Sequence, residues 1–164
     1  MIETRVLSED DWKLWRGLRL AALTEAAYAF GSKLADWQGE GDREERWRGR
    51  LAIPGAYNII AMLDGQPVGM ASGVPTDQDD VVELISMYVA PLGRGRGVGD
   101  QLLQAVERWA RLAGAATLRL AVVEGNTNAW ALYQRNGFHD TDELGGLMPD
   151  GVRRERILTK HLSA

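Results

Sequence analysis

The first quarter of the chain has the hydrophobic spacing of an amphipathic helix. A short strand is expected over residues 2–6, and Ser8, followed by three acidic residues, is suited to begin a helix. Apolar residues then recur every three or four positions, which predicts one buried stripe. The residues of this stripe are Trp12, Trp15, Leu18, Ala22 and Leu23. Lys13, Arg16 and Arg19 would lie on the other face.

Strand patterns replace the helical spacing in the middle of the chain. A stretch punctuated by glycine, residues 31–41, is followed by a second helical segment, 43–51, that ends before Pro54. Residues 57–74 predict two strands joined by a tight turn at Asp64-Gly65. An acidic loop and a further strand over residues 81–91 come next.

A strong helix and an alternation of strand and helix follow. The helix over residues 98–114 would be capped by Gly114, with a buried face of Val98, Leu102, Val106, Trp109 and Ala113. A strand over 117–126 leads into a shorter helix over 127–137. Residues 143–148 and 152–162, on either side of Asp150-Gly151, predict a closing pair of strands.

Composition narrows the class of protein. The 164 residues are 45% hydrophobic, which suits one α/β domain spanning residues 1–164. No apolar run approaches the roughly 20 residues that cross a bilayer, so a cytoplasmic location is expected. The absence of cysteine excludes disulfides, thiolate zinc sites and a cysteine nucleophile, and two scattered histidines, His139 and His161, argue against a metal site.

Charge also argues against general binding of nucleic acid. The formal net charge is -4 and the isoelectric point is near 5.2, whereas nucleic-acid binding normally needs a broad basic surface. An RNA-binding module built on the Arg-Gly repeat of residues 94–97 is therefore disfavoured. An anionic ligand would need a local positive site.

Such a site is indicated where the strand over 81–91 meets the helix over 98–114. The turn from Arg94 to Gly99 contains three glycines and two arginines. The start of a helix offers unpaired N–H groups and about half a positive charge, and glycine lets an anion approach the backbone. A dinucleotide fingerprint would need glycine at position 98, 100 or 102, and an ATP-type loop would need Gly-Lys before Ser or Thr. Neither is present.

Arg94, Gly97 and Gly99 are spaced as in the acyl-CoA motif of the GNAT N-acetyltransferases, and a second segment resembles that family's next motif. The matching residues of the second segment are Asn126, Ala129, Leu132, Tyr133, Gly137 and Phe138. The order and separation of both motifs agree, and the resemblance covers nearly the whole chain. It implies an α/β (α+β) fold with a mostly antiparallel, mixed sheet of about six or seven strands. Two N-terminal helices, and helices after the acyl-CoA-binding strands, would complete it.

The resemblance also implies acetyl-CoA as cosubstrate, no metal, and direct attack by an amine in a ternary complex. The strands ending at Val89 and near Val123 would splay apart, helped by a β-bulge that the sequence does not locate. The pantetheine arm would pair with the backbone of Met87 to Val89, where the Val89 N–H could polarise the thioester carbonyl. The implied cofactor-binding residues are Met87, Tyr88, Val89, Arg94, Gly95, Arg96, Gly97, Val98, Gly99, Asp100, Asn126, Asn128 and Ala129.

Two side chains are candidates for acid–base chemistry. Tyr133 matches the family's general acid, which would donate a proton to the departing thiolate; the alternative is a core aromatic. Glu83 is the candidate base, on the same face as Met87 and Val89 if the strand is regular, although a bulge would reverse that alignment. The alternative for Glu83 is a surface carboxylate. Asn126 could bind the cofactor arm or act as an ordinary helix N-cap.

The acceptor amine is not identified by the sequence. Trp37, Trp47 and Tyr57 could line its pocket or could be core residues. Acidic clusters at 36–45 and 77–80 would suit a cationic amine or simply face solvent. A catalytically idle acyl-CoA sensor on the same fold is the alternative function, and a homodimer is expected only from the resemblance.

Overall fold

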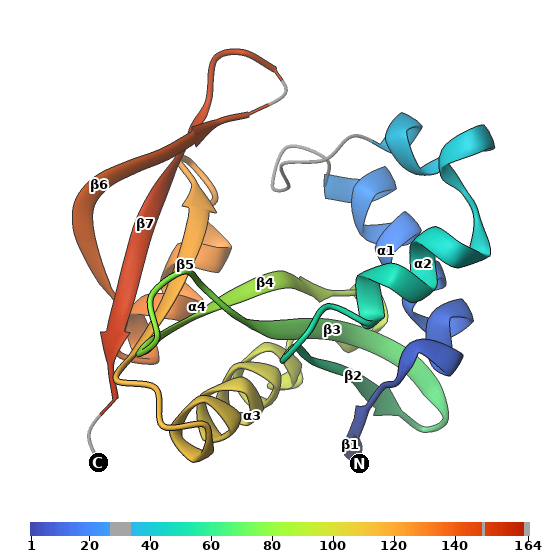
Figure 1. Ribbon diagram of the computed structural model, residues 1–164, viewed down its shortest axis with the longest axis horizontal. Helices are drawn as coiled ribbons and strands as arrows, with labels where there is room; N and C mark the ends of the chain where they lie inside the picture. Colours follow the sequence, from blue (N-terminus) through green and yellow to red (C-terminus); the bar gives the residue numbers. More distant parts are fainter. Residues whose placement is uncertain (27–33, 149, 163–164) are drawn as a thin grey trace.

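The computed structural model describes residues 1–26, 34–148 and 150–162 as a single seven-stranded sheet with helices on both faces (Figure 1). The strands are β1 Ile2–Val6, β2 Tyr57–Leu63, β3 Gln66–Pro75, β4 Val81–Val89, β5 Thr117–Val123, β6 His139–Leu147 and β7 Arg154–His161. The helices are α1 Trp12–Ala26, α2 Glu44–Leu51, α3 Val98–Leu112 and α4 Thr127–Arg135. Short 3-10 turns are η1 Glu9–Asp11, η3 Leu34–Trp37, η4 Gly39–Gly41 and η5 Pro91–Gly93.

The sheet has the strand order β1-β2-β3-β4-β5-β7-β6. Among the strands that the structure describes, only the β4–β5 pair is parallel, and every other neighbouring pair is antiparallel. The prediction of a mostly antiparallel, mixed sheet is therefore confirmed. In Figure 1, β5, β6 and β7 lie on one side of the molecule and α1 and α2 on the other, with β4 running between them.

Each face of the sheet is covered by its own hydrophobic cluster. One face packs against α3 and α4, where Leu102, Val106 and Tyr133 meet strand residues such as Leu84 and Leu120. The other face packs against α1 and α2 through a second cluster. Its fully buried residues include Trp15, Ala22, Trp47, Ile60 and Met70. The two faces are thus covered by different parts of the chain, the N-terminal helices on one and the central helices on the other.

The start of the first helix agrees with its sequence signals. Ser8 precedes one 3-10 turn, and its backbone N–H donates to the Asp11 carboxylate over 2.9 Å, which closes a capping box before α1. The predicted stripe of α1 is buried except for Trp12, which is half-buried. Of the stretch 31–41, residues 34–37 and 39–41 form short 3-10 turns, and 31–33 lie outside the described residues.

Two sequence predictions are corrected. Ala113 is exposed, because α3 ends at Leu112 and the chain turns away there; Ala110 is buried in its place, one turn after Val106. The closing strand β6 begins at His139, four residues before the predicted start at Glu143. Its pairing with β7 is irregular, with register shifts on both sides of Leu144, and this obscures the alternation that would have shown its start.

One described network ties α1 to α2 and so fixes Trp47. The Arg16 guanidinium donates from Nε to Asp42 over 2.8 Å, and the Trp47 indole donates to the same carboxylate over 2.8 Å. These bonds, first from Arg16 and then from Trp47, lower the pKa of Asp42 to about 2. The network holds Trp47 in the layer between α1, α2 and the sheet.

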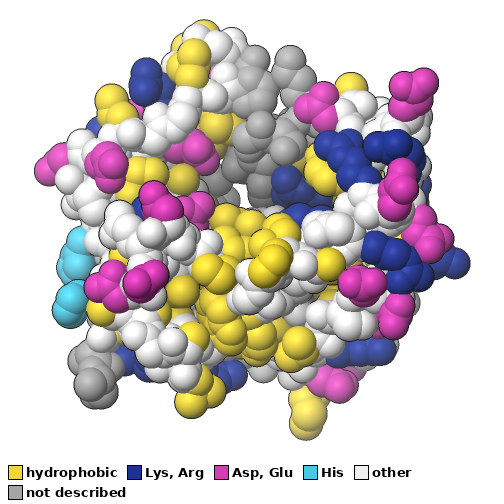
Figure 2. Space-filling view, in the orientation of Figure 1, with side chains coloured by type: hydrophobic (Ala, Val, Ile, Leu, Met, Phe, Trp, Pro, Cys, Tyr) yellow, Lys and Arg dark blue, Asp and Glu magenta, His cyan; other side chains and the backbone are white. Residues whose placement is uncertain are grey.

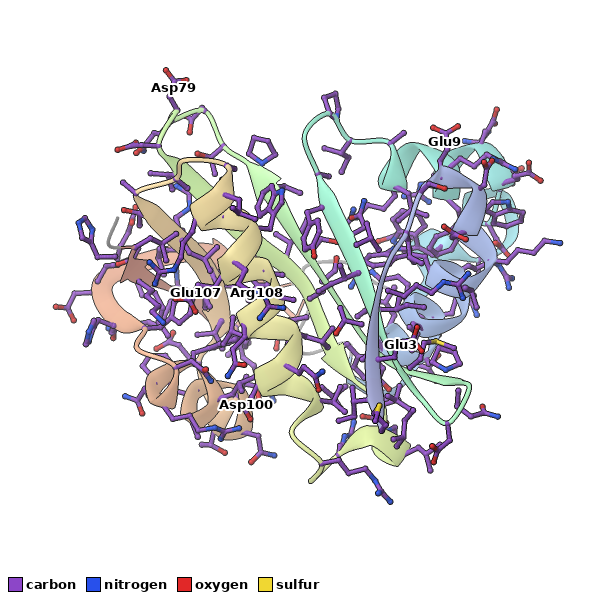
Figure 3. The ribbon with its side chains drawn as sticks, turned by 90° about the horizontal axis from the view of Figure 1, so that it is seen from below. Glu3, Glu9, Asp79, Asp100, Glu107 and Arg108 are labelled. Atoms are coloured by element: carbon purple, nitrogen blue, oxygen red, sulfur yellow. The ribbon has the colours of Figure 1, made fainter. Side chains whose placement is uncertain are left out.

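Replacing Asp42 with asparagine is expected to lower the free energy of unfolding at neutral pH. Because an ordinary aspartate has a pKa of about 3.9, the carboxylate's contribution is complete above about pH 4 and is lost as the pH falls through the folded-state value. Urea unfolding of both proteins at pH 7 and pH 2.5 tests this. The difference should shrink at the lower pH, and Asp79→Asn, an exposed loop control (Figure 3), should show none at pH 7. A difference that does not change with pH would contradict it.

Within the described ranges, no helix combines the length and apolar character needed to span a membrane.

Candidate functional site

The parallel strands β4 and β5 separate soon after they begin to pair. Their ladder joins Val81, Val82 and Glu83 to Thr117, Leu118 and Arg119 and then stops. From Leu84 to Val89, β4 has no partner strand on that side among the described residues. The predicted splay is therefore present, and the separated strands leave room for an extended ligand that could pair with the free edge.

A β-bulge on β4 lies beside this opening. Met70 pairs with Tyr88 and Ser72 with Ile85, so Ala71 faces two residues, Ser86 and Met87. Ser86 has a φ of 56°, an unusual value for a residue with a side chain. The bulge that the sequence could not locate thus lies at Ser86.

The bulge reverses which face of the sheet the later residues of β4 occupy. Val82 and Leu84 belong to the cluster under α3, but Tyr88 belongs to the cluster under α1 and α2. Met87 and Val89 pack toward α3. The prediction that Glu83 shares a face with Met87 and Val89 holds only for a regular strand, and it is wrong for this one.

The glycine-rich turn wraps the start of α3. Gly95 and Gly97 have φ values of 74° and 80°, and a Cβ atom at either position would meet no atom within 4 Å. Gly97 is the N-cap of α3, so the unpaired N–H groups of the first helical turn face the same open space. The turn is therefore shaped to accept an anion, as the sequence indicates.

A cavity of about 480 Å³, called here the turn cavity, opens over this turn. It gathers the predicted cofactor-binding residues from β4, the turn, α3 and α4. Its lining includes Met87, Tyr88, Val89, Arg94, Gly95, Gly97, Val98, Gly99, Asp100, Asn126, Asn128 and Ala129. Arg96 is the exception, because its side chain is exposed and does not line the cavity.

Two of these residues also hold the local structure together. The Asp100 carboxylate accepts two bonds from Arg135, at 3.0 and 2.8 Å, and one from Asn136 at 2.9 Å, which ties the start of α3 to the end of α4. Figure 3 shows Asp100 at this end of α3. Asn126 caps α4 by accepting from the Ala129 N–H over 3.4 Å. Its predicted alternative role as an N-cap is therefore present.

A second cavity, of about 400 Å³, lies on the other side of the splayed strands and is called here the tryptophan cavity. Trp15, Trp37 and Trp47 line it from the N-terminal part of the chain, together with Arg19 and Arg50. Glu83 lines it from β4 and Glu155 from β7. Figure 2 shows a hollow on this face with basic side chains on the α1 and α2 side and acidic ones on the β6 and β7 side.

The two carboxylates of the tryptophan cavity differ in environment. One oxygen of Glu83 accepts both bonds from Arg119, at 2.9 and 2.8 Å. Glu155 pairs with Val123 in the sheet, and burial, followed by the negative charge of Glu83, raises its pKa. Glu155 is therefore a candidate proton acceptor, because it has a raised pKa and lines the cavity. Sequence reasoning missed it, because only strand pairing places β7 opposite β5.

Tyr133 lies where the two cavities meet. Both are lined by Met87, Asn126, Ala129 and Tyr133. Tyr133 is buried, its ring packs 5.9 Å from that of Phe138, and burial raises its pKa, so the phenol keeps its proton. Its ring belongs to the core, as the alternative predicts, while the residue also lines both cavities.

The predicted pocket aromatics are divided by the structure. Trp37 and Trp47 line the tryptophan cavity, with their ring centroids 4.6 Å apart. Tyr57 does not, because its ring stacks on Trp109 of α3 at 5.6 Å, on the other face of the sheet. Of the two alternatives given for Tyr57, the structure supports the core residue. The acidic clusters at 36–45 and 77–80 supply no acidic side chain to the lining of the tryptophan cavity. Figure 3 shows Asp79, of the second cluster, at the opposite end of the molecule from Asp100.

Sequence reasoning also missed two charged residues that line the cavities. Glu25, near the end of α1, forms an ion pair with Arg94 and lines the turn cavity. Arg50 is held from α2 by Asn58, Ser72 and Ser86. No local motif marks either residue, because each reaches its cavity through a contact between distant segments. Among the described residues, no group of His, Asp and Glu is placed to hold a metal ion.

Comparisons with known proteins agree with this geometry. Residues 19–138 match the model of the Acetyltransferase (GNAT) family. The chain is 32% identical over 100 residues to "IAA acetyltransferase" of Azospirillum brasilense, covering 61% of this chain and 65% of that protein. It is 26% identical over 152 residues to aminoglycoside N(6')-acetyltransferase type 1 of Salmonella enteritidis, covering 87% and 95%. The fold matches that of yncA from Salmonella typhimurium, solved with its cofactor acetyl-CoA, with a TM-score of 0.78, 21% identity, and coverage of 100% and 95%.

Proposed function

Because this chain belongs to the acetyltransferase (GNAT) family, we propose that it transfers the acetyl group of acetyl-CoA to an amine by direct attack in a ternary complex. The observation that carries the proposal is the junction of the two cavities at Tyr133 and Met87. A thioester entering from the turn cavity would meet an amine entering from the tryptophan cavity at that junction. Direct attack needs the two reacting atoms in contact, and two cavities that share lining residues would bring their ligands together at those residues.

The turn cavity suits acetyl-CoA on the evidence of its own residues. The open space over Gly95 and Gly97 and the start of α3 would hold the pyrophosphate, and Arg94 adds a positive charge. The free edge of β4 after Glu83 would pair with the amides of the pantetheine arm. Backbone N–H groups at Met87 to Val89 would then polarise the thioester carbonyl.

The residues of the junction would divide the proton chemistry. A carboxylate of the tryptophan cavity takes a proton from the amine, whose nitrogen then forms a bond to the carbonyl carbon as the carbon–sulfur bond breaks. Glu155 suits this role because burial raises its pKa, and Glu83, whose carboxylate accepts two bonds from Arg119, is the alternative. Starting from the ammonium form, the nitrogen loses a second proton as the amide forms, and the Tyr133 hydroxyl passes a proton to the departing thiolate. The products are an amide, free CoA thiol and the protonated carboxylate.

The idle sensor is the less favoured function. A protein that only binds acyl-CoA needs no second cavity with carboxylates opposite the thioester. This chain has such a second cavity, the tryptophan cavity. A single domain over residues 1–164, a homodimer and a cytoplasmic location are also part of the proposal. Light scattering on the purified protein tests the dimer.

Calorimetric titration with acetyl-CoA, followed by measurement of thiol release with a panel of primary amines, tests the function. Micromolar or tighter binding, with release that depends on the amine, is the expected result. Binding without release by any amine would favour the sensor. A folded protein that does not bind acetyl-CoA would rule out the turn cavity as its site.

Replacing Glu25 with glutamine is expected to tighten acetyl-CoA binding about two- to fivefold. Glu25 forms an ion pair with Arg94 and places a negative charge in the turn cavity, so the phosphates must compete with it. Calorimetry at low salt measures the change. Glu9→Gln is the matched control, since it removes the same charge from an exposed site away from the turn (Figure 3). Weaker binding by the Glu25 variant would show that the ion pair positions Arg94 for the ligand.

A further inference from the structure

The wall of the tryptophan cavity formed by α1, α2 and the turn before α2 presents donors. The indole N–H groups of Trp15 and Trp37 are buried and have no hydrogen-bond partner in the part of the chain that the structure describes. An indole nitrogen only donates, and a buried donor without a partner costs free energy. Both residues line the cavity, so an acceptor atom of a ligand would satisfy them.

Two guanidinium groups line the same side. Arg50 donates to Asn58 Oδ1 over 3.1 Å, to Ser72 Oγ over 3.0 Å and to Ser86 Oγ over 3.1 Å, and these oxygens are uncharged. Its guanidinium lies 4.9 Å from the centre of the Trp15 ring. These contacts fix the orientation of Arg50 but do not neutralise its charge.

Arg19 adds a second positive charge close to Arg50. Burial lowers the pKa of Arg19 to about 10. Burial, and then the charge of Arg19, lowers the pKa of Arg50 to about 10. Both therefore stay protonated at neutral pH. An anion bound in the cavity beside the two guanidinium groups would offset their mutual repulsion. Guanidinium groups, like indoles, have no acceptor atom.

The opposite side of the cavity carries the carboxylates Glu83 and Glu155. We propose that the acceptor is a primary amine that also carries an oxyanion, a carboxylate or a phosphonate, bound by Arg19, Arg50 and the indole N–H groups. The amine would then lie toward Glu155. This inference rests on the proposed function and assigns the substrate class of the same site.

The proposed class of acceptor differs from an aminoglycoside, the substrate in the name of the relative from Salmonella enteritidis. An aminoglycoside carries several ammonium groups, which Arg19 and Arg50 would repel, and none of the acidic clusters lines the cavity to offset them. The volume of about 400 Å³ suits a small amine. An amino acid, or a compound of similar size, carries both an amine and an anion, which match the carboxylates and the guanidinium groups of the cavity.

Matched ligands test the proposal on the unaltered protein. Leucine, its phosphonate analogue and isopentylamine share one side chain and differ only in the anion; phenylalanine, its phosphonate analogue and phenethylamine form a second series. Dissociation constants measured in the presence of saturating CoA, and kcat/KM with acetyl-CoA, are compared within each series. We expect at least one oxyanion-bearing member to have a dissociation constant about 30-fold or more lower, and a kcat/KM about 30-fold or more higher, than its decarboxylated partner. The better of carboxylate and phosphonate identifies the anion.

Single variants locate the effect. Arg50→Met and Arg19→Met should each reduce the ratio between anionic and decarboxylated ligands about tenfold or more. Arg108→Met removes an arginine from the exposed side of α3 (Figure 3) and should leave the ratio unchanged. Because Arg50 also bonds to three side chains of the sheet, Arg19→Met is the variant of choice if Arg50→Met does not fold.

The possible failures are distinguishable. Equal or stronger binding of the decarboxylated amines, or preferred acetylation of kanamycin, would overturn the inference and leave the acetyltransferase function intact. Retention of the full ratio in both arginine variants would also overturn it. If acetyl-CoA binds and no amine is acetylated, the proposed function fails, and the ratio of dissociation constants still decides whether the cavity selects an oxyanion.

Discussion

Replacing Tyr133 with phenylalanine is expected to lower kcat about 10²- to 10³-fold while the dissociation constant of acetyl-CoA stays within about twofold of the original value. The ring of Tyr133 is buried against Phe138, and phenylalanine keeps that packing. Only the hydroxyl is lost. Since burial raises the pKa of Tyr133, the phenol is protonated throughout the neutral range, and in the proposed mechanism it gives its proton to the leaving thiolate.

Three measurements separate this role from a structural one. Single-turnover rates report the chemical step, calorimetry reports acetyl-CoA binding, and thermal unfolding reports packing. Tyr57→Phe is the matched control, because Tyr57 stacks on Trp109 and lines neither cavity. Unchanged turnover in Tyr133→Phe would remove the residue from the mechanism. Equal losses in turnover and in acetyl-CoA binding would assign it to the cofactor site alone.

Glu155→Gln is expected to lower kcat/KM about 10²- to 10³-fold at neutral pH. Glutamine keeps the size of the side chain and cannot take the proton of the amine. Glu143→Gln, on the exposed strand β6, is the control and should retain full activity. If Glu83→Gln loses more activity than Glu155→Gln, the role of base belongs to Glu83, as the sequence alone suggests.

The pH dependence gives an independent check with a definite sign. A base must be unprotonated, so the rate rises with pH through the pKa of Glu155, which lies above the ordinary carboxyl value of about 4.3. Glu83→Gln removes the neighbouring negative charge and frees Arg119, and both changes lower the pKa of Glu155. The rise should therefore shift to lower pH in that variant. A shift to higher pH would contradict the assignment.

The parts of the site that the sequence predicts are those built from one continuous segment. The turn from Arg94 to Gly99 carries its own signals, since glycines permit positive φ and the following helix supplies the N–H groups. The bulge at Ser86 has no such signal, because a serine at positive φ looks like any strand serine in the sequence. Only the register of β4 against β3 reveals its position.

The parts that the sequence does not predict depend on contacts between distant segments. Glu155 reaches the tryptophan cavity only because β7 pairs with β5, and Arg50 reaches it through bonds to Asn58 and Ser72. Local spacing says nothing about such pairings. The sequence does not predict the position of the Tyr57 ring for the same reason. The register of β2 directs this ring to α3, where it stacks on Trp109.

The two cavities draw on the chain in different ways. Apart from Glu25, the turn cavity is lined by residues between Met87 and Arg135, whereas the tryptophan cavity takes Trp15, Arg50 and Glu155 from segments far apart in the sequence. Under the proposed function, mutations in α2, in β7 or at the α1 residues that line only the tryptophan cavity can therefore alter which amine is chosen without touching the turn cavity. Selectivity can diverge in evolution while the donor stays the same, and an engineer could exchange α2 to redirect the enzyme while leaving Glu25 of α1 in place.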